Sequence, residues 1–281
     1  MNEIIFDLTN IRIEISFKSY EELRLKLSFL QNNNIYKVNI PCKNNLKKDF
    51  LLNSIKILRE EFPLIDVIPH FSILHEFKRN RNNTLNSFIE FMKVVKGFGC
   101  NEVLLVSGSQ KRSSLDTVST LNYLTDNILF STNDFSIGVA FNPYLSSVLF
   151  DEEVIKLEKK VKSGIVNSIW IQFGTDFTLL ESRIVILKKI IELAEKVNSR
   201  RFNINLYGSI LIPSKEFLAS FKFRPWKGVY CSDEFLNSED LAINLVKELL
   251  KTYKKYKICP LIETDVSKEN KLNSLKKILK K

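Results

Sequence analysis

Long apolar runs are missing from this sequence. A membrane-spanning helix needs about 20 consecutive apolar residues, and polar or charged residues interrupt every apolar stretch well before that length. The first residues, Met1, Asn2 and Glu3, lack the basic flank and apolar run of a secretion signal. We therefore expect a cytoplasmic globular protein with no membrane partner, whose 44% hydrophobic content suffices for a substantial core.

Cysteine and histidine are scarce, with four cysteines and two histidines in 281 residues. The cysteines lie dozens of residues apart, which fits neither a zinc site nor a disulfide framework. His70 and His75 have no further histidine, thiol or carboxylate at ligand spacing, so we expect no metal site. The residues expected to be buried free thiols are Cys42, Cys100, Cys231 and Cys259.

Basic residues outnumber acidic ones, and the formal net charge is +10. The lysines are spread over segments such as 156–162 and 247–257, where acids are interleaved, and they form no stripe with stacking aromatics. This distribution argues against nucleic-acid binding. It is typical of a solvated surface, and it also fits a field that attracts an anionic substrate or cofactor.

Strand-like and helix-like segments alternate along almost the whole sequence. Each unit spans about 30 residues, as in a βα repeat, and eight is the number of strands that closes a barrel. The expected strands are 11–17, 35–40, 65–70, 102–106, 135–140, 168–173, 202–207 and 256–262. The expected helices are 20–31, 47–61, 84–98, 114–125, 152–163, 179–198, 214–221 and 238–254, with a last lysine-rich helix over 271–281.

An open doubly wound sheet would produce the same alternation. However, no glycine-rich phosphate loop follows any early strand, and polar residues recur on one face of several strands instead of at one switch point. We therefore predict an α/β fold with a single (β/α)8 TIM barrel domain over residues 1–281. The sequence leaves the oligomeric state open and is compatible with a homo-oligomer.

Inward-facing polar residues follow from the strand period of two. Helices cover the outside of such a barrel, so the more apolar face of each strand should point outward and the mixed face into the lumen. In 11–17 this rule points Glu14 inward, together with Arg12. A carboxylate desolvated there would hold its proton more tightly and could act as a general acid. Alternatively, Arg12 pairs with Glu14 and keeps it ionised. The other inward polar residues are Lys37, Asn39, Asp66, His70, Ser168, Gln172, Asn203 and Asn205.

Two further features lie at strand ends, where barrel active sites are built. His70 follows Pro69 and could bind a cofactor or satisfy a buried carbonyl. The turn Ser107-Gly108-Ser109 could let backbone amides approach a phosphate or a ring edge, or it could be an ordinary turn.

Four stretches of the sequence, taken in their order and spacing, match a known family, and residues 208–213 match it more weakly. They contain Val67-Ile68-Pro69-His70, then Val103-Leu104-Leu105-Val106-Ser107-Gly108, then Ile137-Gly138-Val139-Ala140, and then 157–164 followed by Ile171-Gln172-Phe173. Together they resemble methylenetetrahydrofolate reductase, a flavin-dependent (β/α)8 enzyme of one-carbon metabolism.

The resemblance implies a role for each matching position. Glu14 would be the general acid that protonates the bridging nitrogen of 5,10-methylenetetrahydrofolate, and the hydride that follows would give 5-methyltetrahydrofolate. Gln172 would contact the substrate, folate or nicotinamide, and we expect Asn39, which the strand period points inward, to contact the substrate as well. NADH or NADPH would be the source of the hydride, and FAD would carry it. The cofactor-binding positions would be His70, Ser107, Ser109, Glu153, Lys156 and Lys160.

Several features of the resembled family are replaced. An Arg-Gly-Asp becomes Ser107-Gly108-Ser109, and Lys156 stands where the family has a neutral flavin contact. These departures leave two hypotheses. The first is a reductase of methylenetetrahydrofolate that works with flavin or, without it, by direct hydride transfer from the nicotinamide. The second is a catalytically inactive folate- or flavin-binding barrel with a binding or regulatory role. A polyglutamylated folate would suit the basic surface.

Overall fold

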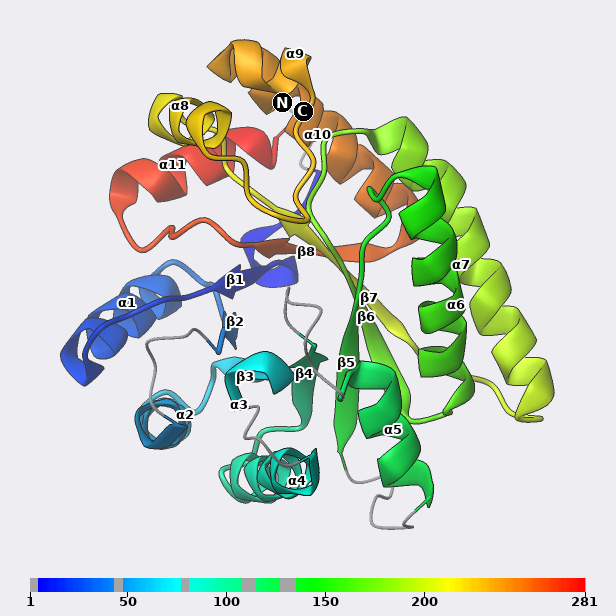
Figure 1. The fold of residues 1–281 in the computed structure, drawn as a ribbon. Coiled ribbons are helices and arrows are strands. Elements are labelled where there is room, and N and C mark those ends of the chain that lie inside the picture. The colour runs from blue at the N-terminus through cyan, green and yellow to red at the C-terminus, as the bar shows by residue number, and fades with distance from the viewer. Residues whose placement is uncertain (1–4, 43–47, 77–80, 108–114, 127–134, 281) are drawn as a thin grey trace.

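Eight parallel strands close into a barrel in the order β1-β2-β3-β4-β5-β6-β7-β8, and β8 pairs with β1. The computed structural model describes residues 5–42, 48–76, 81–107, 115–126 and 135–280. Figure 1 shows the strands at the centre and the helices around them, which is the predicted (β/α)8 TIM barrel. The strands are β1 (Arg12–Glu14), β2 (Lys37–Ile40), β3 (Asp66–Ser72), β4 (Glu102–Val106), β5 (Ser136–Phe141), β6 (Val166–Ile171), β7 (Asn205–Ile210) and β8 (Ile258–Ile262).

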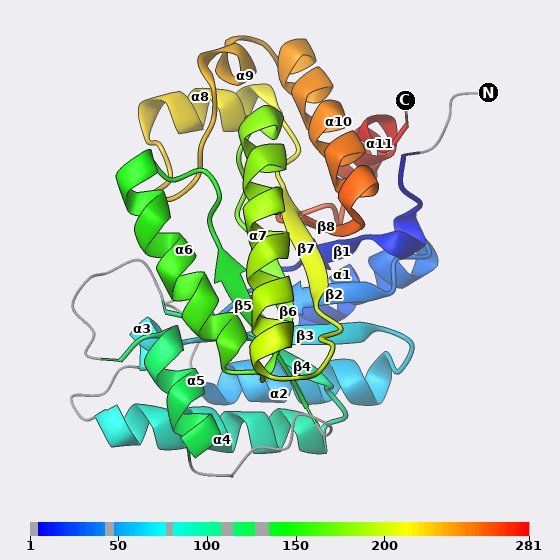
Figure 2. The ribbon, with the colours of Figure 1, turned by 90° about the vertical axis from the view of Figure 1, so that its right-hand side faces the viewer.

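The helices cover the outside of the barrel. Figure 2 shows α6 and α7 side by side over β5, β6 and β7. Within the described ranges, no helix is both long enough and apolar enough to cross a membrane. The helices are the short 3-10 helix η1 (Leu8–Asn10), α1 (Tyr20–Asn32), α2 (Lys48–Glu61), α3 (Ile73–Glu76), α4 (Arg81–Gly97), α5 (Thr117–Asp126), α6 (Ser147–Lys162), α7 (Phe177–Val197), α8 (Lys215–Phe223), α9 (Asp233–Asn237), α10 (Glu239–Tyr256) and α11 (Glu269–Ile278).

Local sequence explains where several helices begin and end. Ser19 accepts the backbone N–H of Glu22 at 3.1 Å, and Asp176 accepts that of Leu179 at 2.8 Å, so each side chain satisfies a free amide in the first turn of α1 or α7. At the other end of α10, Lys257 adopts the left-handed conformation with φ of 58°. This residue turns the chain directly into β8.

The strands separate two apolar regions. Their outward side chains pack under the helices in one large core, to which Ile13 and Val38 belong. A smaller cluster of Ile68, Leu104 and Trp170, with Leu261, fills the middle of the lumen. The prediction that the more apolar face of each strand points outward is confirmed, and the barrel is a packed core without an open pore.

Some predicted boundaries are wrong by several residues. β1 is confined to Arg12–Glu14, and β7 begins at Asn205, not at residue 202, so Asn203 lies before the strand. The reason is pairing: Asn205 is in register with Ser168 of β6, and Ile210 with Ile262 of β8. α6 begins at Ser147, before the predicted residue 152, and η1, α3 and α9 were not predicted. The predicted helix limits at 47, 114 and 281 lie outside the described residues.

All four cysteines are free thiols. Cys100 is buried, and desolvation raises its pKa to about 12. The expectation of full burial is wrong for the other three, which are half-buried: Cys42, Cys231 and Cys259.

Candidate active site at the carboxyl end of the barrel

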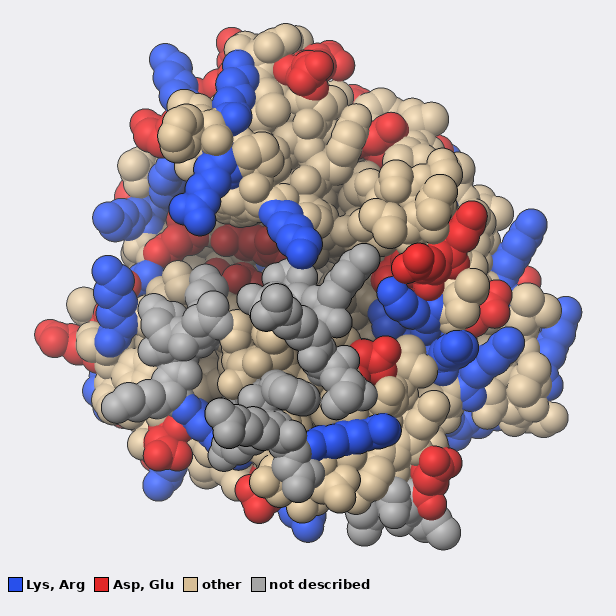
Figure 3. All heavy atoms as spheres, viewed as in Figure 1, with Lys and Arg blue, Asp and Glu red and all other residues tan. Residues whose placement is uncertain are grey.

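Two carboxylates lie side by side where β1 and β8 end. Ile13 pairs with Ile262, so the next residues, Glu14 and Glu263, are lateral neighbours. Each follows an inward-facing residue by two positions, Arg12 or Leu261, and therefore also faces the lumen. The hydroxyl of Ser209 donates to Glu263 at 2.5 Å. Figure 3 views this end of the barrel and shows carboxylates inside a hollow over β1 and β8, with basic side chains at its border.

Arg12 points into the lumen, and its guanidinium donates hydrogen bonds to residues of β2 and β3. Its Nε donates to Asn39 Oδ1 at 2.7 Å, one terminal nitrogen donates to Asp66 at 2.5 Å, and the other donates to the carbonyl of Val38 at 2.8 Å. Arg12 is only 2% exposed. The hydrogen bonds of the guanidinium therefore go to β2 and β3, and an ionic interaction of Arg12 with Glu14 stays a prediction.

Asn39 links Arg12 to His70. Its Nδ2 lies 2.9 Å from His70 Nε2, and the residue is fully buried. A guanidinium can only donate, so the amide oxygen of Asn39 must face Arg12 and its NH2 group must face the ring. Nε2 of His70 is then the acceptor. Both ends of the Asn39 amide are hydrogen-bonded inside the protein. A contact of Asn39 with the substrate stays a prediction.

Gln172 lies directly after β6, on the lumen side that it shares with Trp170. Its backbone N–H donates to the carbonyl of Phe141 at 2.9 Å, which fixes the position of the main chain. The side chain is half-buried, and no described residue forms a hydrogen bond with its amide. The amide can therefore turn toward a ligand at the mouth, where Glu14 of β1 lies three strands away, across β7 and β8.

The helix α6 carries three of the predicted cofactor-binding residues. Lys160 is buried, donates to the carbonyl of Ala140 at 2.8 Å and lies 3.6 Å from Glu153. Desolvation lowers the pKa of Lys160, and the nearby Glu153 carboxylate opposes that shift. Lys156 is exposed and pairs with Glu152 at 3.8 Å. This arrangement fastens α6 to the end of β5.

Ser107, the first residue after β4, has a structural use. The hydroxyl of Ser107 accepts the backbone N–H of Thr117 at 2.9 Å and lies 2.7 Å from the Thr117 hydroxyl, so it caps α5. Ser109 lies outside the described residues. Among the described residues, Ser107, Lys156 and Lys160 contact other protein groups, which does not fit a polar cradle for a flavin at these positions.

A second polar network lies lower in the lumen; Ser168 was predicted to face inward, but its partner Glu102 was missed by the sequence reasoning. Glu102 accepts a hydrogen bond from Ser168, whose oxygen accepts the indole N–H of Trp170 at 2.8 Å. Trp170 stacks on Tyr207, with ring centroids 4.0 Å apart. Burial raises the pKa of Glu102 and raises that of Tyr207 to about 12. A Cβ at Gly138 would lie 2.5 Å from Ser168 Oγ, so glycine leaves room for the network. The alternation of Glu102 with Leu104 could have indicated an inward carboxylate.

No protein-family model matches this chain, and no curated protein matches it in sequence. Among solved structures, it is similar to an endo-laminarinase from Formosa Hel1_33_131, with a TM-score of 0.50, 13% identity, and coverage of 95% of this chain and 80% of that chain. It is also similar to Gox0644 in its apo form, with a TM-score of 0.47, 10% identity, and coverage of 99% and 94%. A third similar structure is a protein from Aquifex aeolicus VF5, with a TM-score of 0.46, 10% identity, and coverage of 87% and 91%. At such identities the likeness concerns the barrel fold and not the chemistry.

Proposed function

We propose that this protein is a methylenetetrahydrofolate reductase-like oxidoreductase that interconverts 5,10-methylenetetrahydrofolate and 5-methyltetrahydrofolate. The observation that carries the proposal is Glu14, an inward carboxylate at the carboxyl end of β1 whose strand neighbour Arg12 is bound elsewhere. The order of the sequence stretches that resemble this reductase family supports the same conclusion.

Glu14 would donate a proton to the bridging nitrogen of the folate, which opens the five-membered ring to an iminium. Reduced nicotinamide would then transfer hydride to the methylene carbon, so that the folate gains a methyl group and NADH or NADPH is oxidised. The neighbouring carboxylate supports this role, because two adjacent carboxylates resist double ionisation.

Gln172 would orient the folate or the nicotinamide through its amide, and the lumen below would exclude water from the reaction. The fixed chain Arg12–Asn39–His70 would hold the imidazole in one tautomer under the mouth. Flavin binding stays a prediction, which the absorption spectrum of the purified protein tests. A yellow preparation with a flavin band would support FAD as the hydride carrier. A colourless but active preparation would support direct hydride transfer from the nicotinamide.

The test is oxidation of reduced nicotinamide that depends on methylenetetrahydrofolate. Glu14→Gln should lower kcat/KM by roughly two to four orders of magnitude, as loss of a general acid does, with an unchanged melting temperature. Glu61→Gln is the matched control, because Glu61 is exposed and pairs with Arg24 on the surface. If Glu14→Gln instead lowered the melting temperature enough to account for the lost activity, Glu14 would have a structural role.

Absence of turnover by the wild-type protein, with and without added flavin, would favour the second hypothesis, a folate-binding barrel without redox chemistry. A polyglutamylated folate would then still bind. Its affinity should fall as salt rises if the basic surface attracts the glutamate tail, and an affinity independent of salt would contradict that part of the proposal.

A further inference from the structure

The opposite end of the barrel holds a pocket of about 570 Å³, which we call the amino-end pocket. Its walls include Arg12, Lys37 and Asp66, which are the first residues of β1, β2 and β3. Lys188 of α7 and Lys257, just before β8, complete the charged lining. The volume lies within the range of small-molecule sites, and the pocket is separate from the mouth where Glu14 and Gln172 lie.

The charges of this pocket are unbalanced. Its one carboxylate, Asp66, is already bound to Arg12 at 2.5 Å. No described residue forms an ion pair with Lys37, Lys188 or Lys257. Lys188 lies 4.9 Å from the ring centre of Tyr256, a contact that leaves its charge uncompensated. Several cations around one hollow repel one another, so an anion bound between them would be stabilised.

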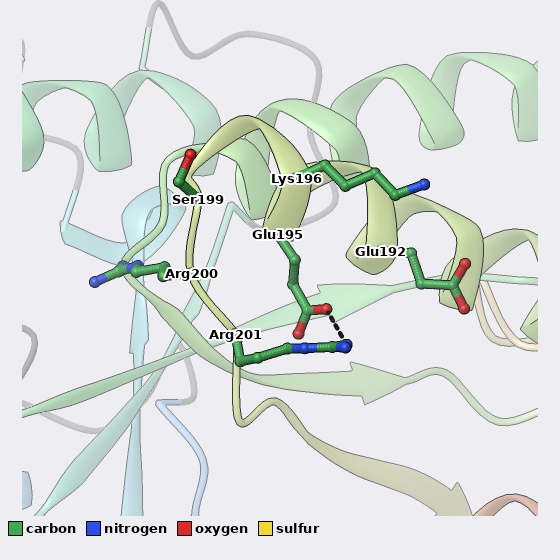
Figure 4. Close-up of a pocket in the computed structure, with 6 residues that line it drawn as sticks. All are labelled: Glu192, Glu195, Lys196, Ser199, Arg200 and Arg201. Carbon is green, nitrogen blue, oxygen red and sulfur yellow. Dashed lines mark hydrogen bonds and ion pairs between the residues drawn. The ribbon is translucent and has the colours of Figure 1, made fainter.

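A neighbouring hollow provides the contrast. Figure 4 shows the end of α7 and the segment that follows, where Arg201 and Glu195 are paired at 3.1 Å. Glu192 lies on the same stretch of helix and adds a second carboxylate to the lining. That hollow holds basic and acidic groups together, so it has no comparable excess of positive charge.

The lysines favour phosphate over carboxylate as the anion. Planar bidentate recognition of a carboxylate is the property of arginine, and the guanidinium of Arg12 is already taken by Asp66 and Asn39. Lysine ammonium groups act as compact point charges that suit the oxygens of a phosphate. Tyr207 and Tyr256 add aromatic wall to the same pocket. We propose that the amino-end pocket binds a small molecule that carries two or more phosphate groups.

Calorimetric titration with sodium tripolyphosphate tests the proposal. The wild-type protein should show saturable binding at one site, weakened by added salt. Neutralising Lys37, Lys188 or Lys257 with glutamine should weaken binding about five-fold for each lysine, and the triple variant about a hundred-fold. Lys196→Gln, in the hollow of Figure 4, makes the same charge change outside the pocket and should leave the affinity unchanged.

A spectroscopic readout locates the bound probe. Trp226→Phe leaves Trp170 as the one remaining tryptophan, and Trp170 stacks on Tyr207 of the pocket wall. Tripolyphosphate should change its emission with the same midpoint as the calorimetric curve, and Glu14→Gln should not alter that midpoint.

Three results would overturn the proposal. They are the absence of saturable binding at millimolar tripolyphosphate, an affinity of the triple lysine variant equal to that of Lys196→Gln, and tighter binding of citrate than of tripolyphosphate. None of these outcomes bears on turnover of a folate at the other end of the barrel.

Discussion

Replacing Arg12 by leucine should destabilise the barrel from within. Two of the acceptors that Arg12 serves, Asn39 Oδ1 and the Val38 carbonyl, belong to fully buried residues, so water cannot replace the guanidinium. Each unsatisfied buried acceptor costs about 1–3 kcal/mol. The third partner, Asp66, has a side chain that is 53% exposed and can be hydrated, so its loss costs little.

The buried carbons of leucine would offset about 1.5 kcal/mol of this cost. We therefore expect Arg12→Leu to lose about 1–4 kcal/mol of unfolding free energy, which corresponds to a fall in Tm of roughly 2–16 °C at about 2–4 °C per kcal/mol. Urea unfolding followed by far-ultraviolet circular dichroism measures the difference. The matched control is Arg24→Leu, which also removes two short hydrogen bonds, at 2.7 and 2.6 Å to Glu61, but on the surface.

An exposed pair of this kind contributes at most about 1 kcal/mol. If Arg12→Leu lost no more stability than Arg24→Leu, the interior network would not stabilise the fold and the reasoning would be refuted. The same variant should release Asn39 from its fixed orientation, which frees the tautomer of His70. Nitrogen-15 chemical shifts of the imidazole would report that change.

Two further predictions concern the packing of the lumen and of the outer layer. Burial raises the pKa of Glu102, so the folded state holds this proton more tightly than the unfolded state. The free energy of unfolding therefore falls as pH rises from the ordinary carboxyl pKa of 4.5 through the raised pKa. Glu102→Gln should therefore raise Tm at neutral pH and give no gain at pH values below the ordinary carboxyl pKa. A Tm that rises equally at all pH values would contradict the raised pKa of Glu102. Gly208→Ala should cost about 1–3 kcal/mol, because its Cβ would lie 2.6 Å from the hydroxyl of Tyr253, which is fully buried and held by the carbonyl of Ser209 at 3.0 Å. Gly97→Ala, where nothing lies within 4 Å, should be neutral or stabilising in the same denaturant titration.

The fold could be predicted because each strand carries a local signal. Outward residues such as Ile13 and Val38 meet helices and must be apolar, while the inward face can be mixed, so the period of two identifies both the strand and its orientation. The limits of β7 could not be predicted this way. Residues before Asn205 alternate almost as well as those after it, and the choice is made by hydrogen bonding to β6 and β8, which lie elsewhere in the sequence.

For the candidate site, the direction of a side chain could be predicted from the sequence, but its partner could not. The inward direction of Glu14 follows from its strand, but the partner of Arg12 is Asp66, which is 54 residues away and has no local signature. Glu263 was missed because the predicted strand ended at Ile262, although the ladder continues through the Glu263 N–H to the carbonyl of Ile210 at 2.9 Å. The apparent ligand role of Lys160 came from resemblance alone, and only the packing of α6 on β5 places its ammonium group against a carbonyl.

The short strand β1 places two oppositely charged residues at different ends of the barrel lumen. Arg12 and Glu14 share a face and lie two residues apart, which is about 6.6 Å along a strand. In water that separation would allow a pair, but Arg12 reaches toward β2 and β3, where Asn39 and Asp66 hold it at the amino end. The hydrogen bonds of the guanidinium therefore satisfy buried acceptors at the amino end of the barrel, and Glu14 lies toward the carboxyl end. This division of partners is compatible with the general acid that we propose at Glu14.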